Sequence, residues 1–184
     1  NRYKVNFEFL EKILIDHATW LSNIDNYQAG TNHGVFESRA LLYLGFTFDN
    51  KDYIDIAKER TLLEINHLFT KEAITTENSF TYQRINKDLF LDIAFILKCK
   101  KDKMSKQLMQ LIFDAEDFMG YTIKPNGYSS SFGDTIMASF IDNKYLNKDS
   151  ALAWACTLGK KGKIEPYKLR FYPESGYFIG REFW

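Results

Sequence analysis

The stretch KDYIDIAKERTLLEINHLF, residues 51–69, indicates most clearly how this chain folds. Its apolar residues recur three and four positions apart, which is the period of an α-helix with one buried face. The predicted buried stripe comprises Ile54, Ala57, Leu62, Ile65 and Phe69. The side chains predicted to face water are those of Lys51, Asp55, Lys58, Glu59 and Glu64. The stretch therefore predicts an amphipathic helix packed against a core.

The same period extends through most of the chain, because only 3 prolines and 10 glycines interrupt its 184 residues. Further helices are predicted over residues 5–22, 34–48, 80–98 and 103–119, with a weaker one over 149–159. The connections between them are short, so consecutive helices are expected to pack as antiparallel hairpins. The predicted fold class is mainly α.

The end of the chain has a different pattern. Residues 124–134, KPNGYSSSFGD, are turn-forming throughout, which predicts a loop. Residues 169–184 are rich in aromatics and are broken by a proline and a Ser-Gly turn. This pattern predicts two short strands that begin a β region. The two strands pair either with each other alone or with strands from a further part of the protein.

Composition narrows the classes of partner. The 24 basic and 24 acidic side chains cancel, so no global positive field draws the chain onto nucleic acid. No stretch approaches the roughly 18 consecutive apolar residues of a membrane span. Cys99 and Cys156 are too few and too far apart for a disulfide framework or a zinc knuckle, and we expect two buried free thiols.

Two runs of basic residues are local exceptions to this balance. They are interpreted as solvated helix ends and loops. The first run comprises Lys98, Lys100, Lys101, Lys103 and Lys106, and the second comprises Lys160, Lys161, Lys163, Lys168 and Arg170.

Two polar segments, each just before a predicted helix, are candidates for chemistry. In residues 31–39, Asn32 and His33 stand at a helix entrance, where free backbone N–H groups favour an anionic ligand such as a carboxylate. The structural alternative is that Asn32 caps the helix and His33 lies on the surface. In residues 75–84, the structural alternative makes Ser79 or Thr81 the cap and packs Tyr82 on a neighbour.

Taken together, these segments resemble the heparinase II/III-like family of polysaccharide lyases, because four landmarks occur in the family's order. The first landmark is Asn32-His33-Gly34 followed by Ala40-Leu41-Leu42; the second is Glu77-Asn78-Ser79 with Tyr82; the third is Pro125-Asn126-Gly127 followed by Gly133-Asp134-Thr135; the fourth is Tyr172-Pro173-Glu174-Ser175-Gly176-Tyr177 with Arg181. The resemblance implies an incomplete α/α toroid over residues 1–165 and the start of a β-sandwich over 166–184.

The resemblance also implies an activity, the β-elimination of uronic-acid linkages in an acidic polysaccharide of the glycosaminoglycan or alginate type. It implies that Asn32, with His33, binds the uronate carboxylate and that Tyr82 is the general acid, or base and acid in turn. Glu77, Gln83 and Arg84 are then expected to bind substrate. These residues require no metal or cofactor. The implied partners are the polysaccharide and a β-sandwich domain of the same protein, and the implied location is periplasmic, secreted or cell-surface-associated.

Two other functions remain open. A helical module that binds carbohydrate or has a structural role could keep the cleft without turnover. It would be distinguished by whether Asn32, His33 and Tyr82 converge in one accessible cleft. A glycoside hydrolase would need two carboxylates facing each other across a cleft. Glu37 and Glu77 are the pair nearest the suspected site.

Overall fold

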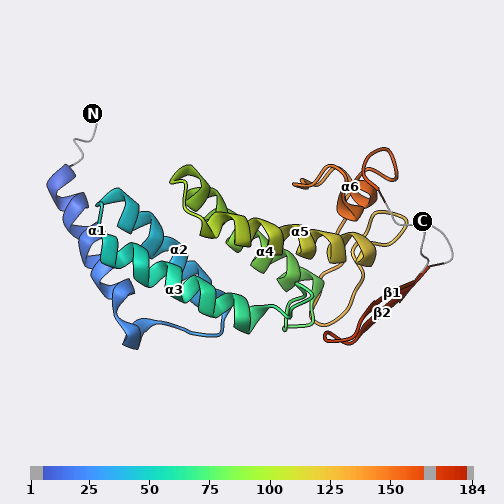
Figure 1. Ribbon diagram of the computed structural model, residues 1–184, viewed down its shortest axis with the longest axis horizontal. Coiled ribbons are helices and arrows are strands. Elements are labelled where there is room, and N and C mark those ends of the chain that lie inside the picture. Colours follow the sequence, from blue (N-terminus) through green and yellow to red (C-terminus); the bar gives the residue numbers. More distant parts are fainter. Residues whose placement is uncertain (1–5, 164–168, 182–184) are drawn as a thin grey trace. The chain divides into compact units, whose positions relative to one another are not determined.

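A computed structural model describes residues 6–163 and 169–181 of the chain. The described part is mainly α-helical and carries one small antiparallel sheet (Figure 1). Its elements are α1 (Phe7–Ser22), the short 3-10 helix η1 (Ile24–Asn26), α2 (Asn32–Thr47), α3 (Lys51–Leu68), α4 (Phe80–Cys99), α5 (Met104–Thr122), α6 (Ala151–Cys156), β1 (Leu169–Tyr172) and β2 (Tyr177–Gly180). The predicted mainly-α class is therefore confirmed, and the helices begin and end within a few residues of the expected positions. Among the described residues, no helix is long and apolar enough to cross a membrane.

The chain forms two compact units, Asn1–His67 and Leu68–Trp184, which we call the N-terminal and C-terminal units. The expected boundary at residues 165/166 stays a prediction, and it falls in a segment outside the described residues. In the N-terminal unit, α1 packs on α2, and Ala18, Val35 and Leu41 are fully buried. These apolar side chains supply the hydrophobic stabilisation of a small helical core.

The pattern predicted for α3 is partly wrong. Ala57 is fully buried as expected, and Lys51 pairs with Asp55 at the surface. Glu64, however, was expected to face water and has no exposed surface, whereas Leu62 is 39% exposed. The reason is local: Glu64 accepts hydrogen bonds from the segment that precedes α2, and these bonds replace its water.

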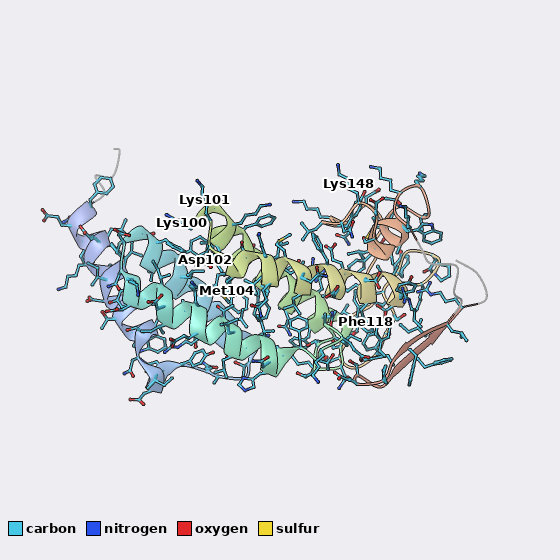
Figure 2. The ribbon with its side chains drawn as sticks, in the orientation of Figure 1. Lys100, Lys101, Asp102, Met104, Phe118 and Lys148 are labelled. Atoms are coloured by element: carbon cyan, nitrogen blue, oxygen red, sulfur yellow. The ribbon has the colours of Figure 1, made fainter. Side chains whose placement is uncertain are left out.

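The C-terminal unit is built on the hairpin of α4 and α5, which lie side by side in Figure 1. The turn between them contains Lys101, whose φ is 57°, and the Asp102 carboxylate accepts a hydrogen bond of 2.8 Å from the Met104 amide (Figure 2). The five lysines of the first basic run are exposed around this turn, as predicted for solvated helix ends and loops. In the second run, Lys160, Lys161 and Lys163 are exposed, and Lys168 lies outside the described residues. The solvated interpretation is wrong for Arg170, which is half-buried because it donates to the Tyr121 hydroxyl at 3.0 Å.

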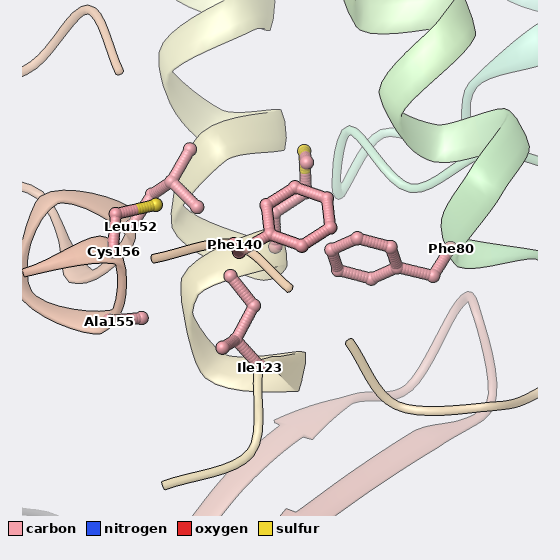
Figure 3. Packing of buried hydrophobic residues seen from close by; sticks show 7 residues of the cluster. Phe80, Ile123, Phe140, Leu152, Ala155 and Cys156 are labelled. Atoms are coloured by element: carbon pink, nitrogen blue, oxygen red, sulfur yellow. The ribbon is translucent and has the colours of Figure 1, made fainter. Parts of the chain in front are cut away.

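A cluster of buried side chains joins α4, α5 and α6 (Figure 3). Phe80 and Phe140 meet edge to face with ring centroids 4.9 Å apart. Gly120 lets α6 approach α5, since a Cβ there would lie 2.3 Å from the Leu152 nitrogen. Cys156 is a free thiol buried in this cluster. The expectation that Cys99 is also buried is wrong, because this free thiol is exposed at the end of α4.

The two predicted strands are confirmed as an antiparallel hairpin. β1 pairs with β2 from Leu169 opposite Gly180 to Tyr172 opposite Tyr177. The last three residues of the predicted β region, 182–184, lie outside the described residues. The hairpin is attached to α5, because the ring of Phe118 contacts both Tyr172 and Tyr177 with centroids 5.2 Å apart.

Candidate functional site

The first landmark lies at the start of α2. The cap is Thr31, not Asn32, since the Thr31 hydroxyl accepts the Gly34 amide at 3.3 Å. Asn32 is then the first helical residue and is half-buried, while His33 is exposed. Because Thr31 acts as the cap, the Asn32 side chain is not needed for that role.

A buried carboxylate holds the segment that leads into this helix. The Gly30 amide donates to both carboxylate oxygens of Glu64 at 3.0 Å, and the Tyr27 hydroxyl donates to the same group. On the other side of the segment, the Gln28 amide donates to Glu37 at 3.0 Å. The backbone before Asn32 is therefore fixed from two helices, α3 and α2.

The same carboxylate explains the glycine in Asn32-His33-Gly34. A Cβ at Gly34 would lie 2.6 Å from the Gln28 carbonyl oxygen and 2.6 Å from a Glu64 oxygen. Only a residue without a side chain fits between them. The landmark and Glu64 thus form one packed arrangement.

Tyr27 and Arg60 complete this arrangement. The Arg60 guanidinium lies 4.2 Å from the centre of the Tyr27 ring and donates to the Leu21 and Ser22 carbonyls at 2.5 and 3.0 Å. Burial, followed by the hydrogen bond to Glu64, raises the pKa of Tyr27, so its hydroxyl stays protonated and donates. Burial lowers the pKa of Arg60.

The second landmark lies at the start of α4. Ser79 is the cap, one of the two caps expected, and its hydroxyl accepts from the Tyr82 amide at 3.5 Å. Tyr82 is half-buried in the first turn, and Arg84 is exposed. The third landmark covers the cap: Thr135 accepts from the Phe80 amide at 2.8 Å, and a Cβ at Gly133 would lie 2.3 Å from the Asn78 carbonyl oxygen.

The predicted substrate-binding residues Gln83 and Glu77 make hydrogen bonds within the protein. The buried Gln83 amide accepts from the Thr75 backbone at 2.6 Å and donates to the Ala73 carbonyl at 2.8 Å. Gln83 has no exposed surface, and its role in substrate binding stays a prediction. Glu77 accepts a hydrogen bond of 2.8 Å from the Asn86 side-chain amide. Because Glu77 is exposed, its carboxylate can still be reached from solvent.

The fourth landmark meets the second. The Tyr177 hydroxyl donates to the Asn78 side chain at 3.3 Å, and Ser175 donates to Glu72 through its amide at 3.0 Å and its hydroxyl at 2.8 Å. Arg181 donates to the carbonyls of Tyr121 and Ile123, and burial lowers its pKa to about 10. The hairpin is therefore bonded both to the loop before α4 and to the end of α5.

The structure thus gathers the predicted site residues into two groups. Asn32 and His33 belong to the N-terminal unit, and Glu77, Tyr82, Gln83 and Arg84 belong to the C-terminal unit. Glu64, Tyr27 and Arg60 were not among the site residues predicted from the sequence. The one available signal was the pair of glycines on either side of Asn32 and His33, which indicates close packing.

The two carboxylates considered for a hydrolase, Glu37 and Glu77, each accept a hydrogen bond from the protein and belong to different units. Within residues 6–163 and 169–181, no group of three or more His, Cys, Asp or Glu side chains could hold a metal ion. Comparisons with protein-family models, with curated proteins and with solved structures find no match to this chain.

Proposed function

We propose that this chain is the helical part of a polysaccharide lyase that cleaves uronic-acid-containing acidic polysaccharides by β-elimination. The observation that carries the proposal is the meeting of the second, third and fourth landmarks at the start of α4. Asn78 bonds to Tyr177, 99 positions away in the sequence, and Thr135 bonds to the Phe80 amide, 55 positions away. Three of the four motifs that motivated the resemblance therefore contact one another at the start of α4, the helix that carries Tyr82.

The chemical problem for such an enzyme is the weak acidity of the hydrogen on C5 of the uronate. In our proposal, Asn32, with His33, hydrogen-bonds the uronate carboxylate and stabilises the negative charge that builds up as this proton leaves. The C4–O bond then breaks, and its electron pair stays on the leaving oxygen. A double bond forms between C4 and C5. Tyr82 acts as base and acid in turn, because it takes the proton from C5 and then gives that proton to the leaving oxygen.

An incomplete α/α toroid is the arrangement that would serve this chemistry. In a ring of antiparallel hairpins, alternate helices run parallel and begin at the same end of the ring. Asn32 and His33 stand at the start of α2, and Tyr82 stands in the first turn of α4. The three side chains named for this chemistry therefore all stand within the first turn of a helix.

The first test is the ultraviolet absorbance of the chain mixed with heparin, heparan sulfate, chondroitin sulfate, hyaluronan or alginate, because the unsaturated uronate absorbs where the substrates do not. We expect a steady rise on at least one polymer. Tyr82→Phe should slow it by about 10²–10⁴-fold, the usual contribution of a general acid. Asn32→Ala should slow it by about 10²–10³-fold through loss of charge stabilisation.

Matched controls separate chemistry from folding. Tyr43→Phe removes a hydroxyl from an exposed tyrosine of α2, and Asn66→Ala removes an exposed amide of α3. Both controls should keep the wild-type rate. An equal loss in Tyr43→Phe and Tyr82→Phe would contradict the role assigned to Tyr82. Binding of a polymer with no absorbance rise would favour the carbohydrate-binding module.

A further inference from the structure

We propose that the groove between α4, α5 and residues 140–161 is a second binding site for acidic sugar chains, on a face of α4 different from that of Tyr82. The acidic-sugar class rests on the proposed function. The groove has a volume of about 1000 Å³. Ligand pockets in proteins commonly have about 300–1,000 Å³, so this groove has room for several sugar units.

Helix geometry separates the groove from the Tyr82 face. Arg84, Asp88, Leu91 and Phe95 line it, and their spacing of three to four residues places them along one stripe of α4. Tyr82 is two positions before Arg84, which is about 200° around a helix of 3.6 residues per turn. A sugar chain bound in the groove therefore lies on a different face of α4 from the Tyr82 side chain.

Basic side chains reach the groove from three separate segments. Arg84 comes from α4, Lys144 from the loop before α6 and Lys161 from the segment after α6. All three are exposed. An arginine fork suits a planar carboxylate or a sulfate, and lysine supplies further positive charge.

One buried lysine pairs with two of the three acidic side chains of the groove. Lys87 is buried, and its ammonium lies 2.7 Å from Asp88 and 3.8 Å from Glu116. Asp142 is the third acidic side chain of the lining. The lining therefore carries four cationic side chains, those of Arg84, Lys87, Lys144 and Lys161, against three carboxylates.

The apolar part of the wall suits the carbon face of a sugar ring. Phe95 is 44% exposed and lies next to Leu91 on the lining stripe of α4. Phe140 is buried behind this wall, and the Arg84 guanidinium lies 5.9 Å from its ring centre. Aromatic and aliphatic surface combined with a few charged groups is the usual composition of a ligand pocket.

The far wall of the groove is held in place by Glu116. This carboxylate has no exposed surface and accepts from the Leu146 amide at 3.0 and 3.1 Å and from the Asn147 amide at 3.3 Å. The loop that carries Lys144 is thereby attached to α5. Desolvation raises the pKa of Glu116, which favours its neutral form inside the wall. A wall fixed before binding costs less ordering entropy when a ligand binds.

The test is the affinity of fluorescently labelled hexasaccharides of chondroitin sulfate, hyaluronan and alginate, measured by anisotropy, with maltohexaose as the neutral probe. Combined Arg84→Gln, Lys144→Gln and Lys161→Gln should weaken binding of an acidic hexasaccharide by at least tenfold. The matched control is combined Lys100→Gln, Lys101→Gln and Lys103→Gln, which removes three charges at the α4–α5 turn. It should change affinity less than threefold, and maltohexaose should bind neither protein.

The outcomes distinguish this inference from the lyase proposal. Tyr82→Phe should lose elimination and keep hexasaccharide binding in the groove. Binding without any elimination in the wild type would remove the lyase proposal and leave the groove supported. Equal weakening by the two triple variants, or no binding of any acidic hexasaccharide, would overturn the groove. If the triple variant at Arg84, Lys144 and Lys161 loses binding of the chondroitin sulfate hexasaccharide alone, and still binds the hyaluronan and alginate hexasaccharides, the groove selects sulfate.

Discussion

Replacing Glu64 by leucine should destabilise the N-terminal unit. Leucine is similar in size, so little packing volume changes, but it accepts no hydrogen bond. The Gly30 amide and the Tyr27 hydroxyl would each lose their acceptor. An unsatisfied buried donor costs about 1–3 kcal/mol. Gly30 is exposed and Tyr27 is half-buried, so water replaces part of what each donor loses, and the predicted total is about 2 kcal/mol, the low end of this range for two donors. This is a measurable part of the about 5–15 kcal/mol that stabilises a typical domain.

The assay is urea unfolding followed by far-ultraviolet circular dichroism, with the free energy of unfolding extrapolated to water. Glu59→Leu is the control, because Glu59 is an exposed glutamate of the same helix and a surface change there is worth about 0.5 kcal/mol or less. Tyr27→Phe should remove part of the same network, so its effect should be much smaller in a Glu64→Leu background. Equal losses for Glu64→Leu and Glu59→Leu would refute the reasoning.

Three further predictions concern single contacts. Gly34→Ala should cost about 1–3 kcal/mol by overpacking against the Gln28 carbonyl and Glu64, measured by the same unfolding assay; a neutral effect would mean that the contact relaxes freely. Thr135→Val should cost about 0.5–2 kcal/mol, the usual worth of a helix cap, and unchanged stability would remove its role at α4. Burial raises the pKa of the Cys156 thiol from 9.0 to about 11, so between these values the unfolded chain loses a proton that the folded protein keeps. Stability should therefore fall as pH rises through this window. Urea midpoints measured below and above the window should show a smaller fall in Cys156→Ala than in the wild type. An equal fall in both proteins would contradict the raised pKa of the Cys156 thiol.

The helices could be predicted because each one needs only a periodic apolar face, and that period is visible in the sequence. The two strands of the hairpin were equally visible from their aromatic residues and the turn between them. Periodicity assigns a charged residue to the surface by default, and this is why Glu64 was misplaced. Its burial depends on hydrogen bonds from Tyr27 and Gly30, which lie 37 and 34 positions away in the sequence.

The candidate site was only partly predictable for a related reason. The helix starts carrying Asn32 and Tyr82 could be located from polar residues before apolar runs. The cap at α2 was misassigned by one residue, because Thr31 and Asn32 are both good caps and local sequence does not choose between them. The contact between Asn78 and Tyr177 depends on how the chain returns to α4, and no local pattern encodes that return.

The mass of the released oligosaccharides tests the central claim most directly, measured on the acidic polymer that gives the largest absorbance rise. Elimination adds no water, so the masses of the two products should sum to the mass of the substrate. Tyr82→Phe should release far less of both, while Tyr43→Phe should match the wild type. Products whose summed mass exceeds the substrate by one water would show hydrolysis and contradict the lyase assignment.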